Sequence, residues 1–288
     1  MMHQRQYLER HANNGESNMA DIRIGITGSA GRMGITLARE VAAASGCVLS
    51  GASEQKDHPF IGHDPGQVAS LGVTGLAIKD GAREVFQASD VVLDFTLPAA
   101  TVDHANLAAE YRTALVIGTT GLESEHSAAL ERAANKTAIV QAANMSVGVN
   151  VLLHVTRWVS EILDEDYDIE IVEMHHRHKV DTPSGTALAL GRAAAEGRGV
   201  DLDAAARRGR DGITGARERG TIGFSALRGG DVVGDHSVIF AADGERVELA
   251  HKASSRQVFS RGAVRAARWV HGKPAGLYSM MDVLGLTS

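Results

Sequence analysis

The sequence predicts an α/β protein built from two units, a parallel sheet wrapped by helices and an α+β unit with a mixed sheet. Two patterns in the chain carry this prediction. In the first half, short runs of β-type residues alternate with alanine-rich helical stretches, which is typical of a parallel sheet. In the second half, strand-type runs follow one another with turns in place of helices, which indicates a partly antiparallel, separate sheet.

Composition and charge fit a globular protein of this kind. The 288 residues suit two domains, and 44% hydrophobic with 22% charged residues exclude wholesale disorder. With a net charge of -6, the protein has no overall positive charge to attract polyanions. Neither nucleic acid nor a membrane surface is therefore expected as a partner. The single cysteine, Cys47, excludes an internal disulfide and favours a cytoplasmic location. No apolar run is long enough to span a bilayer, and residues 1–19 are expected to form a disordered tail.

The first unit is expected to contain five strands, with a glycine-rich turn after the first. This turn leads into a helix over 35–44. Alanine-rich helical stretches separate the later strands, so the strands should pair in parallel. The strand-type runs lie at 22–27, 48–52, 91–95, 115–117 and 138–140.

The second unit begins where this alternation ends, after Asn144. A last helix, over 258–270, is expected to return to the first unit. The predicted first domain therefore comprises 20–146 and 256–288, and the second comprises 147–255. Inside the second domain the expected elements are helices at 147–163 and 186–196 and strands at 168–174, 220–224, 237–241 and 246–250.

The glycine-rich turn has the spacing G-x-x-G-x-x-G, formed by Gly28, Gly31 and Gly34. Such a turn between a first strand and a helix lets backbone N–H groups approach a pyrophosphate, as in Rossmann-like cofactor domains. Arg32 is a second candidate for this contact. A tight turn without a ligand is the alternative interpretation of the same glycines.

An acidic residue stands where a dinucleotide-binding domain would use one. Glu54 lies about 20 residues beyond the glycine turn, just after the second strand, where a carboxylate accepts hydrogen bonds from the adenosine ribose. Its charge favours NADH over NADPH, although Lys56 is available for a 2′-phosphate. The cofactor prediction is therefore NADH, NADPH or both, and a solvated turn residue is the alternative role for Glu54.

Two further stretches should line the same pocket, because the carboxyl ends of parallel strands meet at one edge of the sheet. Phe95 and Thr96 follow one strand, and Gly118, Thr119 and Thr120 follow the next. Glycine allows close approach to the nicotinamide ribose, and threonine supplies hydroxyl groups. Structural turns are the competing interpretation.

The richest chemistry lies in residues 173–186, EMHHRHKVDTPSGT. Its three histidines suggest zinc, but Arg177 and Lys179 would stand beside the cation, so no metal site is predicted. Positive charge suits an anion better. The stretch Thr182 to Thr186 opens a helix whose free N–H groups favour a carboxylate or phosphate, with Thr182 or Ser184 as the cap.

Together these motifs closely resemble the family of 4-hydroxy-tetrahydrodipicolinate reductase, also called dihydrodipicolinate reductase, of lysine and diaminopimelate biosynthesis. The resemblance covers nearly everything after Met19, and the long histidine motif is its most specific part. The matching stretches are GSAGRMG at 28–34, GTTG at 118–121, ANMS at 143–146, the histidine motif, and HKASSR at 251–256.

The resemblance implies a nicotinamide-dependent reductase of a small dicarboxylate, assembled as a homotetramer. It implies that His175 is the catalytic histidine with Lys179 as its partner. The implied substrate-binding residues are His176, Lys179, Ser184, Gly185 and Thr186. The predicted cofactor-binding residues are Gly28, Ser29, Ala30, Gly31, Arg32, Met33, Gly34, Glu54, Gln55, Phe95, Thr96, Gly118, Thr119, Thr120, Ala143, Asn144 and Met145.

Two positions depart from the family pattern. Gln55 stands where some members carry an arginine thought to help bind NADPH, and Leu97 replaces a basic residue near the cofactor. Three other functions compete with the reductase: another two-domain dehydrogenase of the aspartate or homoserine type, a nicotinamide-binding sensor, and a metal-dependent hydrolase. The first leaves the histidine segment unexplained.

Overall fold

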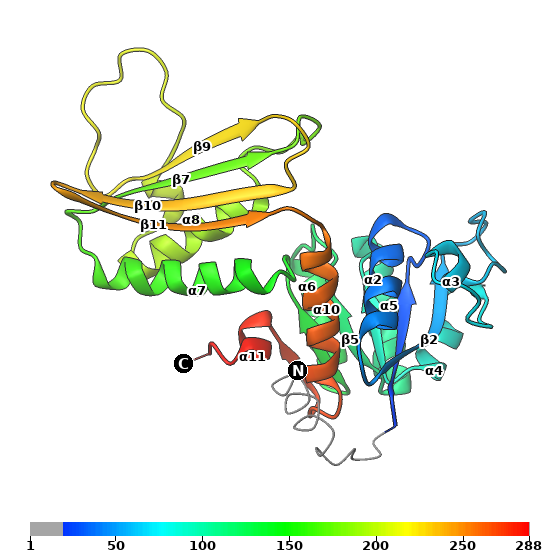
Figure 1. Ribbon diagram of the computed structural model, residues 1–288. Coiled ribbons are helices and arrows are strands. Elements are labelled where there is room, and N and C mark those ends of the chain that lie inside the picture. Colours follow the sequence, from blue (N-terminus) through cyan, green and yellow to red (C-terminus); the bar gives the residue numbers. More distant parts are fainter. Residues whose placement is uncertain (1–19, 288) are drawn as a thin grey trace, which may run out of the picture.

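The computed structural model describes residues 20–287, which form two sheets with their helices (Figure 1). The predicted tail at 1–19 lies outside the described residues. Sheet A has seven parallel strands in the order β12-β6-β5-β4-β1-β2-β3. Their bounds are β1 Ile22–Thr27, β2 Cys47–Glu54, β3 Ile78–Asp80, β4 Val91–Asp94, β5 Ala114–Ile117, β6 Ala138–Gln141 and β12 Gly276–Tyr278.

Helices cover both faces of sheet A because its strands are apolar on both sides. Val91 and Leu93 point to a core shared with α2, α10 and α11, whereas Val92 points to a core shared with α4, α5 and α6. The helices are α2 Arg32–Ala43, α4 Arg83–Ala88, α5 Pro98–Tyr111, α6 Ser124–Ala134, α10 Gln257–Val270 and α11 Met280–Leu284, with a short α3 at Pro65–Val68.

Sheet B is mixed and has five strands in the order β11-β10-β7-β9-β8. β10 pairs antiparallel with both β7 and β11, whereas β9 pairs in parallel with β7 and β8. One face packs on two helices, α7 Val147–Ile162 and α8 Gly185–Arg198. The strands are β7 Asp168–His175, β8 Ala206–Arg208, β9 Ile222–Arg228, β10 Gly234–Ala242 and β11 Glu245–Ala253, and a short α9 spans Leu202–Ala205.

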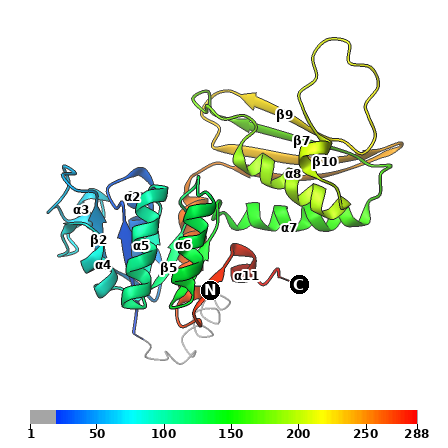
Figure 2. The same cartoon turned by 180° about the vertical axis from the view of Figure 1, so that it is seen from behind.

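The chain crosses between the two sheets twice, at α7 and between β11 and α10 (Figures 1 and 2). α7 begins beside sheet A and runs beneath sheet B, and α10 brings the chain back. The return of α10 to sheet A confirms the predicted packing of the last long helix, because Ala263, Val264 and Val270 are buried in the core of that sheet. The fold class is confirmed, and the division at 146 and 256 stays a prediction.

Some expected bounds are wrong. α2 begins at Arg32, not at residue 35, so Arg32, Met33 and Gly34 belong to its first turn. β9 spans Ile222–Arg228 in place of the expected 220–224. The short strands β3, β8 and β12 were not predicted, because runs of three residues carry too little periodicity to be recognised.

Candidate active site

A chain of three adjoining hollows runs from the carboxyl edge of sheet A toward sheet B. The first, of about 570 Å³, contains Glu54 and Gln55, and it shares Phe95 and Thr96 with the second, of about 470 Å³. The second shares Arg32 with a third, of about 750 Å³. Of the predicted cofactor residues, the first hollow also contains Gly28 and Gly31, and the second also contains Met33, Gly118, Thr119, Thr120, Ala143, Asn144 and Met145.

Three predicted cofactor residues shape the glycine loop and line none of these hollows: Ser29, Ala30 and Gly34. A Cβ atom on Gly34 would lie 2.2 Å from the carbonyl oxygen of Gly28, so only glycine lets α2 start this close to the loop. The N–H of Ala30 donates a 2.8 Å hydrogen bond to Oε1 of Glu54. Glu54 therefore holds the loop while it lines the cleft.

A buried carboxylate that the sequence analysis did not single out supports the floor of the cleft. Asp94 ends β4, is fully buried, and accepts a 2.5 Å hydrogen bond from Thr96 and a 3.2 Å bond from Thr27. Its Oδ2 lies 3.3 Å from Nδ1 of His104. Burial raises the pKa of Asp94, but the hydrogen bonds and the nearby His104 outweigh it and hold the pKa below its usual range.

The loop after β5 is held against the loop after β4. A Cβ atom on Gly118 would lie 2.1 Å from the ring of Phe95, so glycine here lets the two loops touch. The hydroxyl of Thr119 accepts a 3.0 Å hydrogen bond from the N–H of Thr96, and it also bonds Thr101 at 2.9 Å. These bonds fix the part of the cleft predicted to hold the nicotinamide ribose.

Asn144 joins the cleft of sheet A to the helices of sheet B. Its Nδ2 donates to Oγ1 of Thr186 at 3.2 Å, and its Oδ1 accepts from the N–H of Ser146 at 2.9 Å. Met145 is buried against α10, where a Cβ on Gly262 would lie 1.7 Å from its carbonyl oxygen. The predicted cofactor and substrate residues therefore meet at the start of α7.

His175 ends β7, and its ring is buried. Its side chain is 10% exposed, and its Nδ1 lies 2.6 Å from Oε2 of Glu173. The ring of His236 packs against it edge to face, with 5.1 Å between centroids. Two strand positions separate Glu173 from His175, so both side chains point to the same face.

Glu173 is a buried anion with a full set of donors. Arg228 donates to both oxygens at 2.8 Å, and the N–H of Ser184 donates at 3.1 Å. Burial raises the pKa of Glu173, but the hydrogen bonds from Arg228 and His175 outweigh it and keep the pKa below its usual range. The carboxylate is therefore charged at neutral pH.

Two histidines of sheet B bond the serines that cap the helices. Ser184 caps α8 and accepts from the N–H of Ala187 at 3.1 Å, which confirms it as the cap, and it also bonds His236 at 3.0 Å. Ser146 caps α7 and lies 3.4 Å from His251. Burial, followed by the charge of His175, lowers the pKa of His236 to about 4, so this ring is neutral at physiological pH.

Lys179 and His176 are less available to bind an anion than the sequence suggests. Nζ of Lys179 forms a 2.8 Å ion pair with Asp181, and this pair lowers the pKa of that carboxyl. His176 and Arg256 line the third hollow together with Arg32. Desolvation and then the Arg256 charge lower the pKa of His176, so the protonated form of His176 is disfavoured.

The three histidines of the motif do not gather around one point. Within residues 20–287, no group of three or more His, Cys, Asp or Glu side chains is placed to hold a metal ion. His175 bonds Glu173, whereas His176 and His178 stand on the third hollow. In the same described part of the chain, no helix is both long and apolar enough to cross a membrane.

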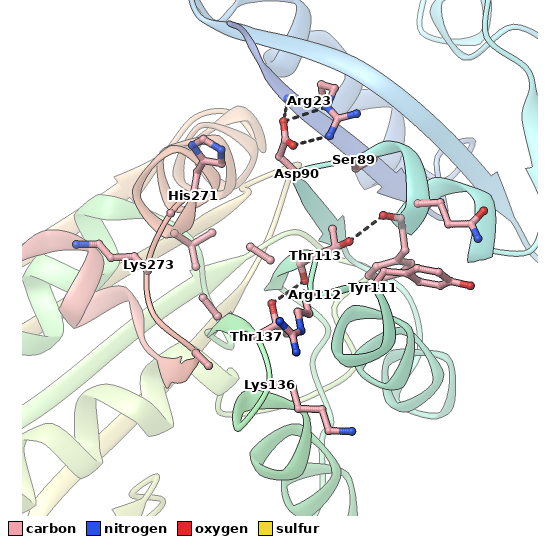
Figure 3. A pocket seen from close by; sticks show the side chains of 17 residues that line it. Arg23, Ser89, Asp90, Tyr111, Arg112, Thr113, Lys136, Thr137, His271 and Lys273 are labelled. Carbon is pink, nitrogen blue, oxygen red and sulfur yellow. Dashed lines mark hydrogen bonds and ion pairs between the residues drawn. The ribbon is translucent and has the colours of Figure 1, made fainter. Parts of the chain in front are cut away.

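Another hollow, of about 710 Å³, lies at the opposite edge of sheet A (Figure 3). Several cations line it, but Arg23 is engaged by Asp90 and the side chains of Lys136 and Lys273 point away from each other. All predicted site residues lie in the described part of the chain, and none of them lines this hollow. The predicted cofactor residues that line a hollow therefore gather at the carboxyl edge.

The parallel sheet, the glycine turn and the long cleft at its carboxyl edge define a dinucleotide-dependent oxidoreductase with a second unit built on sheet B. Two family models, described as the N-terminus and the C-terminus of dihydrodipicolinate reductase, match residues 22–145 and 148–284. The chain therefore belongs to the dihydrodipicolinate reductase family, and it is an oxidoreductase.

Several proteins are similar to the chain over nearly its whole length. The 4-hydroxy-tetrahydrodipicolinate reductase of Ruegeria pomeroyi is 56% identical over 91% of this chain and 97% of its own. That of Parvibaculum lavamentivorans is 54% identical over 93% and 99%. A dipicolinate-bound dihydrodipicolinate reductase from Paenisporosarcina sp. TG-14 has the same fold, with a TM-score of 0.70, 24% identity, and coverage of 91% and 98%.

Glu173, Arg228, His236 and Asp94 are the structural additions to the predicted site. A signal for Glu173 was present, since the alternation of the strand places it on the same face as His175. Arg228 could not be found this way, because its contact depends on the parallel register that pairs it with His175. The position of His236 depends likewise on the pairing of β10 with β7.

The neutral, buried His236 predicts a pH-dependent stability. Below its reference pKa of 6.5, an unfolded chain binds a proton here that the folded protein takes up only near pH 4. Stability should therefore fall as the pH drops from 6.5 toward 4, by at most roughly 3 kcal/mol. His236→Gln should lose less stability between pH 7 and pH 5 than the parental protein in urea unfolding. Equal losses in the two proteins would contradict this assignment.

Proposed function

We propose that the protein reduces 4-hydroxy-tetrahydrodipicolinate to tetrahydrodipicolinate, with loss of water, in diaminopimelate and lysine biosynthesis. The observation that carries the proposal is the Asn144–Thr186 hydrogen bond of 3.2 Å. It brings the end of the cofactor cleft against the N-terminus of α8, beside His175. The high identity to reductases of this name supports the substrate.

The residues of the cleft fit a nicotinamide dinucleotide. Gly28 and Gly31 line it without side chains, and Gly28 adopts a left-handed φ of +64°. The pyrophosphate would lie over this loop at the start of α2, Glu54 would bind the adenosine ribose, and Thr119 and Asn144 would lie near the nicotinamide. The bound cofactor supplies the hydride.

The substrate is a cyclic dicarboxylate that becomes a conjugated imine after losing water. Addition at C4 moves electron density toward the nitrogen, so a nearby proton donor stabilises the transition state more than the ground state. His175 and Lys179 are the candidates for this proton. Beside Ser184, whose own N–H donates to Glu173, the free N–H groups of Gly185 and Thr186 would hold a carboxylate, since a Cβ on Gly185 would meet no atom within 4 Å.

The same proposal includes the domain roles, the compartment and the assembly. The segment 147–255 would bind substrate and oligomerise, and the first domain would bind the cofactor. Sheet B leaves Leu227 half exposed on the face away from α7 and α8, which supports a face that associates with other copies in a homotetramer. The single cysteine supports a cytoplasmic location.

The direct test is oxidation of NADH and of NADPH with 4-hydroxy-tetrahydrodipicolinate freshly made from pyruvate and aspartate semialdehyde. Substrate-dependent cofactor oxidation supports the reductase and excludes a sensor without turnover. Activity that survives a chelator excludes the metal-dependent hydrolase. Oxidation only with aspartate semialdehyde or homoserine-type substrates would favour the competing dehydrogenases.

The first prediction concerns the catalytic pair. His175→Gln should lower kcat by roughly 10²- to 10⁴-fold, the usual contribution of general acid catalysis, with the Kd for NADH nearly unchanged. Lys179→Ala should lower kcat and raise the substrate KM, because it removes a cation beside the carboxylate site. Steady-state kinetics and cofactor titrations measure both effects. Near-parental turnover in both variants would refute the assignment.

The second prediction concerns cofactor preference. The protein should use NADH at least as well as NADPH, because the Glu54 carboxylate repels a 2′-phosphate. Glu54→Gln removes the charge while its amide oxygen can still accept from Ala30, so it should move the kcat/KM ratio toward NADPH. A parental preference for NADPH above about tenfold, or roughly 1.4 kcal/mol, is the opposite outcome.

The third prediction is that pyridine-2,6-dicarboxylate competes with the substrate and does not act by removing a metal. Thr186→Val should raise its inhibition constant and the substrate KM together, since a shared hydrogen bond contributes about 0.5–1.5 kcal/mol. A chelator of different shape is the control and should leave activity intact. Equal inhibition by unrelated chelators, reversed by zinc, would overturn this prediction.

A further inference from the structure

Glu173 is better placed to control His175 than any other group that contacts its ring in residues 20–287. The carboxylate is 1% exposed and lies 2.6 Å from Nδ1. Because the carboxylate is charged and has no proton to give, Nδ1 must be the donor in this bond. The neutral ring then carries its proton on Nδ1 and leaves Nε2 as the free nitrogen.

Other contacts fix the carboxylate so that it cannot follow the ring. Arg228, which β9 places beside His175 in the parallel ladder, donates from Nη1 to Oε2 and from Nη2 to Oε1, both at 2.8 Å. The N–H of Ser184 donates to Oε1 at 3.1 Å. The two oxygens are therefore unequal: Oε1 faces two donors that cannot become acceptors, and Oε2 faces one such donor and the histidine.

The other ring nitrogen, Nε2, faces the backbone of Gly234, whose lack of a side chain leaves room beside it. Nε2 lies beside Gly234, where even a Cβ atom would stand at 3.0 Å. The edge-to-face contact with His236 holds the ring plane. The ring is thus clamped at Nδ1 and along one face, and Nε2 is the atom available for a reaction.

We propose that Glu173 is a positioning residue, which Arg228 holds in place, and that it keeps the His175 proton on Nδ1 so that Nε2 serves the substrate. The proposal rests on the proposed role of His175 as proton donor. In turnover the imidazolium gives its Nε2 proton to the substrate as the hydride reaches C4. The N–H electron pair stays on Nε2, the Nδ1 proton stays in the bond to Glu173, and solvent returns the lost proton.

Glu173→Gln tests this because an amide, unlike a carboxylate, has one acceptor oxygen and one donor NH₂ group. Its oxygen is needed at the Oε1 end, where two donors converge, so the NH₂ group faces His175. Nδ1 must then accept, and the neutral ring moves its proton to Nε2. The imidazolium is also disfavoured, because Nδ1–H would face another N–H.

The matched control is Glu170→Gln. Glu170 lies on the same strand but on the opposite face, where Arg210 and Arg217 donate to it at 2.8 Å and 3.0 Å. It is thus also an arginine-bound carboxylate, without contact to His175. Its substitution should leave kcat and the histidine tautomer unchanged.

The measurement is ¹⁵N NMR of the full-length histidine-labelled protein at a pH where His175 is neutral, with His175→Gln for assignment. The parental protein should show Nδ1 protonated, and Glu173→Gln should show Nε2 protonated. The variant's kcat should fall roughly 10- to 100-fold, within the range of general acid catalysis, while its KM for NADH changes less than about twofold.

A parental ring protonated on Nε2 would overturn the proposal, even if Glu173→Gln does not fold. Near-parental kcat in a folded Glu173→Gln protein would also overturn it, as would an equal loss in Glu170→Gln. Failure of the parental enzyme to turn over the substrate would instead refute the proposed function, while the tautomer measurement still stands by itself.

Discussion

The buried carboxylate of Glu173 is the contact on which the substrate side of the site depends. A charge removed from water is costly unless donors surround it, and here Arg228, His175 and the backbone of Ser184 supply them. Because these donors come from β9, from β7 itself and from the start of α8, one side chain fixes the position of three elements. The pairing of Glu173 with His236, and of His236 with His251, extends this polar row across the sheet.

That row also determines where the two helices begin. His236 bonds the cap of α8 and His251 lies beside the cap of α7, so both helix N-termini start from the same band of sheet B. α7 begins only a few residues after the strand that ends at the cofactor cleft. Asn144, in the intervening turn, then bonds Thr186 of α8. The cofactor cleft and the proposed carboxylate site are therefore joined by a side-chain hydrogen bond between the turn before α7 and the first turn of α8.

Much of this could be predicted from the sequence, and the reason differs between the two units. In sheet A, glycine spacing and the order of strands place Gly28, Glu54 and Thr96 at one edge, because parallel strands all end there. In sheet B the site depends on register between strands distant in sequence. Nothing local in the chain says that Arg228 pairs with His175. The alternation in β7 did contain the relation between Glu173 and His175, and an acidic residue at a buried strand position is the signal to look for.

In the folded protein, the charge of Lys179 is paired and the protonated form of His176 is disfavoured. The sequence suggests a cluster of free cations, but Lys179 is paired with Asp181, and the pKa of His176 is lowered by desolvation and by Arg256. In the proposed reaction, a substrate carboxylate would therefore compete with Asp181 for Lys179, and it would itself favour protonation of His176. The N-terminus of α8 needs no such exchange of partners, because the Ser184 cap already fixes its first turn. Recognition of the proposed dicarboxylate would thus begin at backbone groups, and Lys179 would complete it once the anion has displaced Asp181.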